Sequence, residues 1–213
     1  MIRLLVAGEG ANELGRFARA DRSAGEAERT VGPGVIEALL AKIRPGGWEI
    51  RRALLWRDVR KYRPGLPGEG EARTVNGLIL LARELGCHAL VFLRDRDGQR
   101  RRERALAQAV KRALQLVDRP PLIAAGVPVE KMEAWLLALR AERMTESCSD
   151  PVAALHERHG VPPKRTAAMV ELVHNARLRL VPADARSLLR WLRQAAGALC
   201  VRVPRDWPVP ARP

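Results

Sequence analysis

Short apolar runs alternate with amphipathic stretches along the first 140 residues, and this alternation limits the folds that the chain can adopt. The apolar runs have the length of buried strands and cover residues 2–7, 48–56, 89–93 and 121–127. Segments with helical spacing of apolar side chains follow them at residues 34–43, 71–85, 100–116 and 129–139. This order predicts an α/β fold, in which helices flank a mostly parallel sheet.

The remainder of the chain differs in character from this alternation. Helical spacing recurs in three segments with proline-containing joints, over residues 150–156, 164–173 and 183–196. The tail from Val203 holds four prolines and is expected to be extended. We therefore expect an α/β domain over residues 1–140 and a C-terminal helical extension with a proline-rich tail over residues 141–213. Polar or Pro- and Gly-rich loops are expected over residues 16–33 and 62–70.

The charge of the chain favours polyanionic partners. Lys and Arg number 38 against 24 Asp and Glu, which gives a net charge of +14. Nucleic acid is the first partner to expect from such a balance. A GC-rich genome, which enriches Arg, Ala, Gly and Pro together, is the alternative explanation.

Several features indicate a cytoplasmic protein without a membrane span. The three cysteines are far apart and form no Cys-x-x-Cys motif, which is typical of a reducing compartment. The first apolar run is too short for a signal peptide, and no run reaches the roughly 18 apolar residues of a membrane-spanning helix.

Acidic residues follow three of the four predicted strands. Asp95 and Asp97 come directly after the apolar run 89–93, and residues i and i+2 of a strand point to the same side. Parallel strands present their carboxyl ends at one edge of the sheet, where ligands bind in open α/β folds. The carboxylates expected to meet there are Glu9, Glu13, Asp95, Asp97, Glu130 and Glu133.

Clustered carboxylates repel one another unless a cation lies between them. A hard divalent ion with oxygen ligands, Mg²⁺ or Mn²⁺, fits best, and such a cluster is what a one- or two-metal phosphoryl-transfer site requires. Each acid also has a structural alternative. Asp95 and Asp97 are flanked by arginines that could pair with them, and Glu130 and Glu133 would favour the first turn of a helix through its dipole alone.

The order of these motifs resembles the Toprim domain of topoisomerases, primases and nucleases of the overcoming-lysogenization-defect type. The similar segments are Glu-Gly-x-x-Glu at residues 9–13 and Asp-x-Asp-Gly at residues 95–98. Residues 127–138, which contain Glu-Ala-Trp-Leu, look like a segment of small stand-alone Toprim-like proteins of bacteria. These are often encoded beside an ABC-type ATPase in settings linked to phage or plasmid defence. The resemblance covers roughly residues 1–140.

The resemblance implies a nuclease that depends on Mg²⁺ or Mn²⁺ and cleaves DNA, with RNA as the less favoured substrate. It implies catalytic roles for Glu9, Asp95 and Asp97. It implies metal ligation by Glu9, Glu13, Asp95 and Asp97, with Glu130 or Glu133 completing the site. An ABC-type ATPase would be the protein partner.

Arginines near the same edge are candidates for contacts with nucleic-acid phosphates: Arg94, Arg96, Arg100, Arg101 and Arg102. The first turn of a helix disfavours cations, so the basic start of the segment 100–116 indicates a task such as phosphate contact. Two alternatives stay open. Arg94 and Arg96 could neutralise the aspartates, and the first-turn arginines could form a solvated helix face.

Other functions also stay open. The chain could be a non-catalytic nucleic-acid-binding or regulatory subunit of an ABC-type ATPase complex, or a nucleotidyl transferase that uses the same metals. A homodimer is left open as well. The tryptophans fit core or interface packing better than stacking on bases: Trp48, Trp56, Trp135, Trp191 and Trp207.

Overall fold

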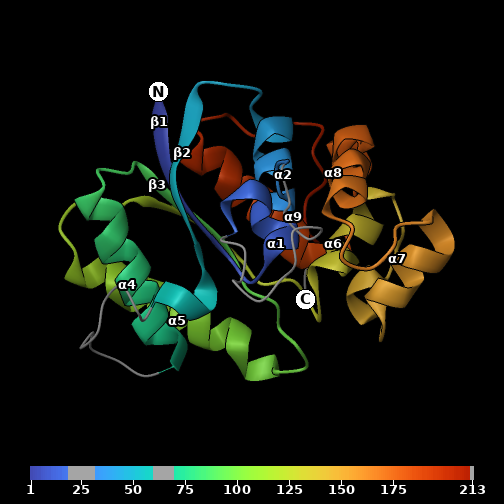
Figure 1. Ribbon diagram of the computed structural model, residues 1–213, viewed down its shortest axis with the longest axis horizontal. Helices are drawn as coiled ribbons and strands as arrows, with labels where there is room; N and C mark the ends of the chain where they lie inside the picture. Colours follow the sequence, from blue (N-terminus) through green and yellow to red (C-terminus); the bar gives the residue numbers. More distant parts are fainter. Residues whose placement is uncertain (19–31, 60–69, 212–213) are drawn as a thin grey trace.

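The sheet at the centre of the molecule is parallel throughout. The computed structural model describes residues 1–18, 32–59 and 70–211 (Figure 1). In these residues one four-stranded sheet has the order β2-β1-β3-β4, and each neighbouring pair is parallel. The strands are β1 (Ile2–Gly8), β2 (Trp48–Leu55), β3 (Ala89–Leu93) and β4 (Leu122–Gly126). The predicted α/β class is confirmed, and the arrangement is consistent with a Rossmann-like fold.

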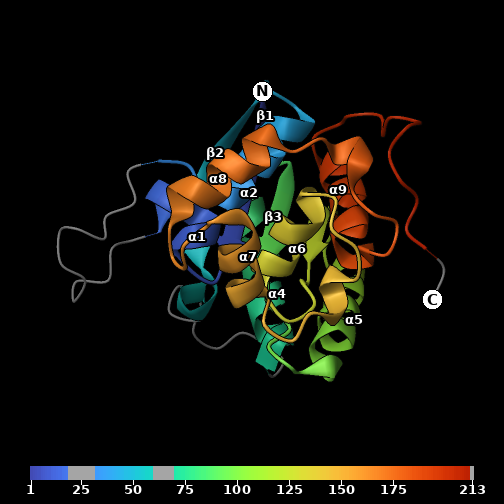
Figure 2. The same cartoon turned by 90° about the vertical axis from the view of Figure 1, so that its right-hand side faces the viewer.

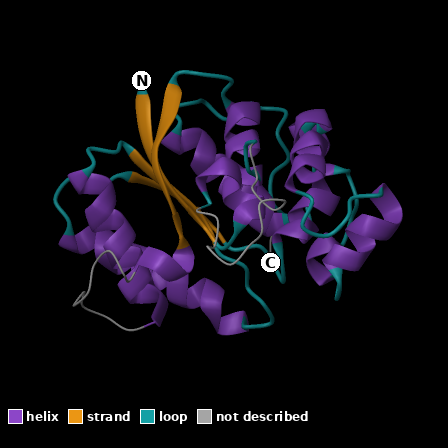
Figure 3. Cartoon of the chain, in the orientation of Figure 1, coloured by secondary structure: helices purple, strands orange, loops and turns teal. Residues whose placement is uncertain are grey.

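Helices cover both faces of this sheet (Figures 1 and 2). One face carries α4 (Gly70–Glu84) and α5 (Arg100–Leu116). The other carries α2 (Val35–Ile43), α6 (Met132–Leu139), α8 (Thr166–Asn175) and α9 (Arg186–Ala198). Helix α7 (Pro151–His159) packs beside α6. Figure 3 shows the strands enclosed between helices. In keeping with this cover on both faces, β3 is apolar at all five positions and buried throughout.

The helical extension shares its core with the sheet. Leu4 and Val6 of β1 point to the face that α9 covers, whereas the alternating residue Leu5 points to the face of α4 and α5. Trp191 of α9 and Trp135 of α6 lie in the same hydrophobic cluster as Leu4, with ring centroids 5.6 Å apart. The domain boundary expected after residue 140 stays a prediction, and this cluster runs across it.

The structure differs from the predicted elements in two places. The segment after the first strand, for which no helix is predicted, contains the short helix α1 (Ala11–Leu14). The helix expected from residue 129 begins at Met132, because Glu130 adopts a left-handed φ of 65° that a helix does not accept. The loops expected over 16–33 and 62–70 fall mostly outside the described residues.

The remaining elements are single short turns that join the larger ones. They are η1 (Gly15–Phe17), η3 (Trp56–Asp58), η4 (Thr145–Ser147) and η5 (Leu178–Leu180). None of the helices in residues 1–18, 32–59 and 70–211 has both the length and the apolar character needed to cross a membrane.

Candidate functional site

The ends of β1, β3 and β4 lie side by side at the carboxyl edge of the sheet. Ala7 pairs with Phe92, and Leu93 pairs with Gly126, so the segments that follow these strands start as neighbours. The backbone N–H of Asp95 donates to Oε1 of Glu9 at 2.9 Å. The predicted meeting of the first and third strand ends is therefore seen in the structure.

Glu13 reaches the same edge through α1, which packs closely over the end of β1. Gly8 makes this approach feasible, since a Cβ at position 8 would lie 2.8 Å from the Cβ of Glu13. The backbone N–H of Gly10 donates to Oε2 of Glu13 at 2.8 Å, which fixes the side chain. Glu13 is buried as a result.

Three acids at this edge, Glu13, Asp95 and Glu133, form no ion pair within the described residues, and we call them the unpaired carboxylates. Burial, together with the charges of Glu13, Glu9 and Glu133, raises the pKa of Asp95 to about 9. Burial also raises the pKa of Glu13 to about 7, with added repulsion from Glu9 and Glu133. The pKa of Glu133 is raised by burial too. The cluster therefore holds protons near neutral pH when nothing else compensates its charge.

Glu9 pairs with Arg94 and also accepts from Asp95 N. Three further acids near this edge, Glu71, Asp97 and Glu130, are bound by arginines, and we call these three the arginine-held carboxylates. Oε1 of Glu71 lies 3.3 Å from Nε of Arg94 and 3.2 Å from Nε of Arg102. Asp97 Oδ2 lies 3.1 Å from Nη1 of Arg102.

Glu130 is engaged by partners of its own. It forms an ion pair with Arg96 and accepts the backbone N–H of Gly98 at 2.9 Å. The hydrogen bond from Arg96 is the main cause that lowers the pKa of Glu130. Of the two alternatives for the fourth strand end, Glu133 therefore joins the unpaired carboxylates and Glu130 does not.

The expectation that Asp95 and Asp97 point to one side of an extended strand is wrong. Strand β3 ends at Leu93, and the chain turns at Asp97, which has a left-handed φ of 47°. Asp97 consequently faces Arg102, and its charge is the smallest contribution to the raised pKa of Asp95. A ligand role for Asp97 stays a prediction.

The predicted phosphate-binding arginines divide into two groups. Arg94, Arg96 and Arg102 are engaged by carboxylates of the chain itself, and Arg102 is buried. Arg100 and Arg101 are exposed at the start of α5 and form no ion pair in the described residues.

Further basic side chains on α5 were not predicted as binding residues. Arg104, Lys111 and Arg112 are exposed and form no ion pair in the part of the chain that the structure describes. Their helical spacing from Arg101 was the signal that could have found them. With Arg100 and Arg101 they form what we call the α5 basic face.

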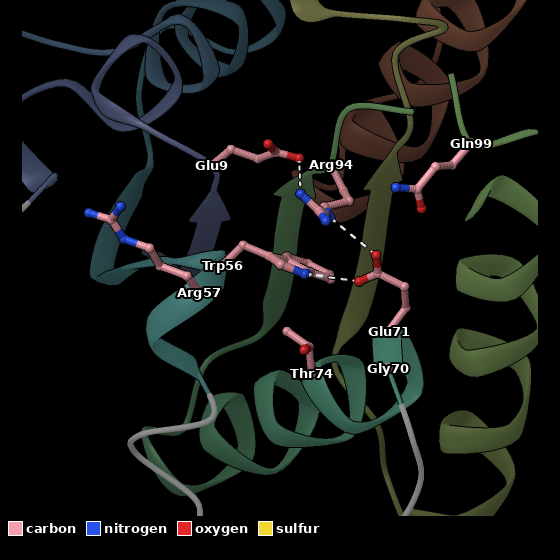
Figure 4. Close-up of a pocket in the computed structure, with 8 residues that line it drawn as sticks. All are labelled: Glu9, Trp56, Arg57, Gly70, Glu71, Thr74, Arg94 and Gln99. Carbon is pink, nitrogen blue, oxygen red and sulfur yellow. Dashed lines mark hydrogen bonds and ion pairs between the residues drawn. The ribbon is translucent and has the colours of Figure 1, made fainter. Parts of the chain in front are cut away.

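No three His, Cys, Asp or Glu side chains in residues 1–18, 32–59 and 70–211 form a group arranged to hold a metal ion. The carboxylate of Glu9 is directed at Arg94 (Figure 4). The donor chemistry nevertheless fits a hard divalent cation, because the unpaired carboxylates offer only oxygens and share an uncompensated charge. A cation among them would remove the repulsion that raises the pKa of Asp95.

A cavity of about 590 Å³ opens beside Glu9 (Figure 4). Its lining comes from the ends of β1 and β3, from η3 and from α4, and comprises Glu9, Trp56, Arg57, Gly70, Glu71, Thr74, Arg94 and Gln99. Trp56 Nε1 donates to Oε2 of Glu71 at 3.0 Å. Sequence reasoning missed Glu71, whose signal was an acid in the first turn of a helix after a Pro- and Gly-rich segment.

Comparisons of this chain with protein-family models, with curated proteins and with solved structures give no match. The Toprim resemblance therefore stays a prediction, and the function has to be argued from the carboxyl edge of the sheet.

Proposed function

We propose that the chain is a metal-dependent nuclease that cleaves phosphodiester bonds, with DNA favoured over RNA. The observation that carries the proposal concerns Glu13, Asp95 and Glu133, which come from three segments and form no ion pair in the described residues, while burial and the charges of Glu13 and Glu133 raise the pKa of Asp95. These acids stay unpaired in a chain of net charge +14. A shortage of arginines therefore does not explain why they lack partners.

Mg²⁺ or Mn²⁺ would be held by the unpaired carboxylates together with Glu9. When bound, such an ion supplies activation of water and stabilisation of charge on the phosphate. Glu9 is joined to the start of this cluster, because its Oε1 accepts from Asp95 N as well as from Arg94, and its charge adds to the burial that raises the pKa of Asp95 and Glu13. The resemblance to the Toprim domain implies metal ligation by Glu9, Glu13, Asp95 and Asp97, with Glu130 or Glu133 completing the site. Of the last two, Glu133 is favoured because Glu130 is paired with Arg96.

The residues around the cluster can hold and orient a phosphodiester backbone. If Glu9 binds the cation, Nη1 of Arg94 becomes available for a phosphate oxygen. Glu71 still holds Nε of the same guanidinium at 3.3 Å and keeps it in position. The α5 basic face begins one residue after Gln99, which lines the cavity beside Glu9. Exposed arginines and lysines of this kind bind backbone phosphates without regard to sequence.

The test is cleavage of supercoiled plasmid and of labelled single strands by the purified protein. Reactions with Mg²⁺, Mn²⁺ or EDTA are compared between the natural chain and Asp95→Asn, which preserves the size of the side chain. The proposal expects cutting that needs the metal and is lost in the variant. Equal cutting by both proteins would contradict it. Retained DNA binding without any cutting would favour a binding subunit that acts with a partner such as an ABC-type ATPase.

A further inference from the structure

The cavity beside Glu9 has the size and the lining of a site for one flat polar ring. Its volume of about 590 Å³ falls within the roughly 300–1,000 Å³ of small-molecule sites. Trp56 forms part of its wall and packs against Phe92, with ring centroids 5.3 Å apart, and the guanidinium of Arg94 lies over its ring, 5.8 Å from the centroid. These contacts and the hydrogen bond from its Nε1 to Glu71 hold the ring in place, which suits contact with another ring.

Most charged side chains that line the cavity pair with one another. Arg94 binds Glu9 and Glu71, and Glu71 also accepts from Trp56. Gln99 by contrast points inward (Figure 4), is exposed, and makes no side-chain hydrogen bond in the described residues. An aromatic wall with one uncommitted amide suits a neutral nucleobase better than a second phosphate, because the amide offers both a donor and an acceptor.

The cavity and the carboxylate cluster are joined through Glu9. This residue lines the cavity, and its Oε1 accepts from Asp95 N at 2.9 Å. A nucleotide whose base occupied the cavity would therefore place its phosphate beside the unpaired carboxylates. A base inside a duplex is stacked and paired, so only an unpaired or extruded base can enter.

We propose that this cavity binds the base of one unpaired nucleotide next to the phosphate that is cleaved, so that the substrate is single-stranded. The inference rests on the proposed function and names its substrate class. Gln99 reads the base edge, Trp56 and Thr74 form the walls, and the α5 basic face holds the neighbouring phosphates. A strand with stacked, paired bases would reach the basic face but not the cavity.

The experiment measures binding without cleavage, so that its outcome does not depend on nuclease activity. Fluorescence anisotropy in EDTA compares a labelled 12-nucleotide single strand with a duplex of the same sequence. The natural chain is expected to bind the single strand about tenfold more tightly, as expected for one base held against an aromatic wall. Gln99→Ala is expected to weaken single-strand binding about fivefold and to leave duplex binding unchanged.

The matched control is Gln108→Ala, which removes the same side chain from an exposed position on α5, the helix that Gln99 precedes. It is expected to leave both affinities unchanged. Equal affinity for the two nucleic acids, or equal behaviour of the two glutamine variants, would overturn the proposal. Binding of free nucleoside monophosphate without any preference for single strands would also overturn it, since it would assign the cavity to a free nucleotide. If the natural chain prefers single strands but shows no cleavage with either metal, the result counts against the nuclease proposal alone.

Discussion

Two sets of acidic side chains lie near the same edge of the sheet, and they differ in what compensates their charge. The arginine-held carboxylates each contact a guanidinium group, and the pKa of Glu130 is lowered as a result. The unpaired carboxylates have no such contact in the described residues, and burial raises the pKa of Asp95 to about 9. Asp95 and Asp97, only two residues apart, fall on opposite sides of this division.

The difference indicates which acids are structural and which are available for chemistry. Arg94 and Arg96 flank Asp95 in the sequence, yet they bind Glu9, Glu71 and Glu130. The arginines therefore tie the loops after β3 and β4 together and leave Asp95 uncompensated. A buried cluster of like charges costs stability, so its retention favours a cation supplied from solution.

The largest effect is expected on cleavage. Asp95→Asn should lower the metal-dependent rate roughly 10²–10³-fold, because it removes a ligand that holds charge next to the phosphate. Asp97→Asn should lower it about tenfold or less, since Asp97 is held by Arg102 at 3.1 Å. Initial rates on one labelled single strand with Mn²⁺ measure both. Equal losses in the two variants would remove the distinction between the two sets of acids.

The second effect is on stability and depends on pH. The folded pKa of Asp95 is about 9, whereas an unfolded aspartate titrates near ~3.9. The folded state thus holds a proton that the unfolded state has released, and stability falls as pH rises from about 4 to about 9. Asp95→Asn cannot lose this proton. In EDTA it should be more stable than the natural chain by roughly 2–4 kcal/mol at pH 9, and equally stable near pH 4.

Urea denaturation at several pH values measures this difference. Asp97→Asn is the matched control, because the same chemical change there removes an ion pair with Arg102 and should slightly destabilise the fold. If the free energies of unfolding of Asp95→Asn and the natural chain differ by the same amount at every pH, Asp95 titrates as an ordinary exposed aspartate.

The third effect concerns the arginine-held set. Glu71→Gln should destabilise the fold by about 1–3 kcal/mol, because it removes the carboxylate that lies 3.2 Å from Nε of the buried Arg102 and 3.3 Å from Nε of Arg94, and leaves Arg102 with Asp97 as its one ion-pair partner in the described residues. Glu103→Gln is the control, since Glu103 pairs with Arg190 on the surface and should cost less than about 1 kcal/mol. Thermal denaturation compares the two variants. If Glu71→Gln and Glu103→Gln destabilise the fold by similar amounts, Glu71 does not organise the site.

The smallest effect is on nucleic-acid binding by the α5 basic face. Arg101→Ala with Arg104→Ala should weaken single-strand binding several-fold, and should reduce the slope of log K against log salt by about 1–2. Arg179→Ala on η5 is the control and should leave the slope unchanged, because it removes an exposed arginine from another part of the molecule. Anisotropy titrations at several salt concentrations make the comparison. An unchanged slope in the double variant would assign phosphate binding to another surface.

The parts of the fold that the sequence predicts well are those that local physics determines. Residues 89–93 are apolar throughout and form β3 with those bounds, because both faces of the sheet are covered. Residues 100–116 repeat apolar side chains at helical spacing and form α5 with those bounds. The parallel arrangement of the strands also followed from the alternation, and it predicted that the strand ends carrying Glu9 and Asp95 lie at one edge, where the two residues are hydrogen-bonded.

The partners of individual charges could not be predicted in the same way. Whether Asp95 or Asp97 binds an arginine depends on the φ of 47° at Asp97, which follows from the packing of the loop and not from the spacing Asp-x-Asp. Glu71 lies 23 residues from Arg94 in the sequence and contacts it only after α4 has docked on the sheet. Choices of this kind arise from tertiary contacts, so they separate the candidate acids only in the folded chain.

The most direct test of the central claim is isothermal titration calorimetry of Mn²⁺ binding to the purified protein at pH 7.5. Titrations in two buffers of different ionisation enthalpy give the number of protons released on binding. If the unpaired carboxylates form a cation site, the natural chain binds Mn²⁺ and releases protons, because Asp95 and Glu13 must lose theirs. Asp95→Asn then loses the binding, and Glu103→Gln keeps it. Absence of Mn²⁺ binding in the natural chain, or undiminished binding in Asp95→Asn, would contradict the account.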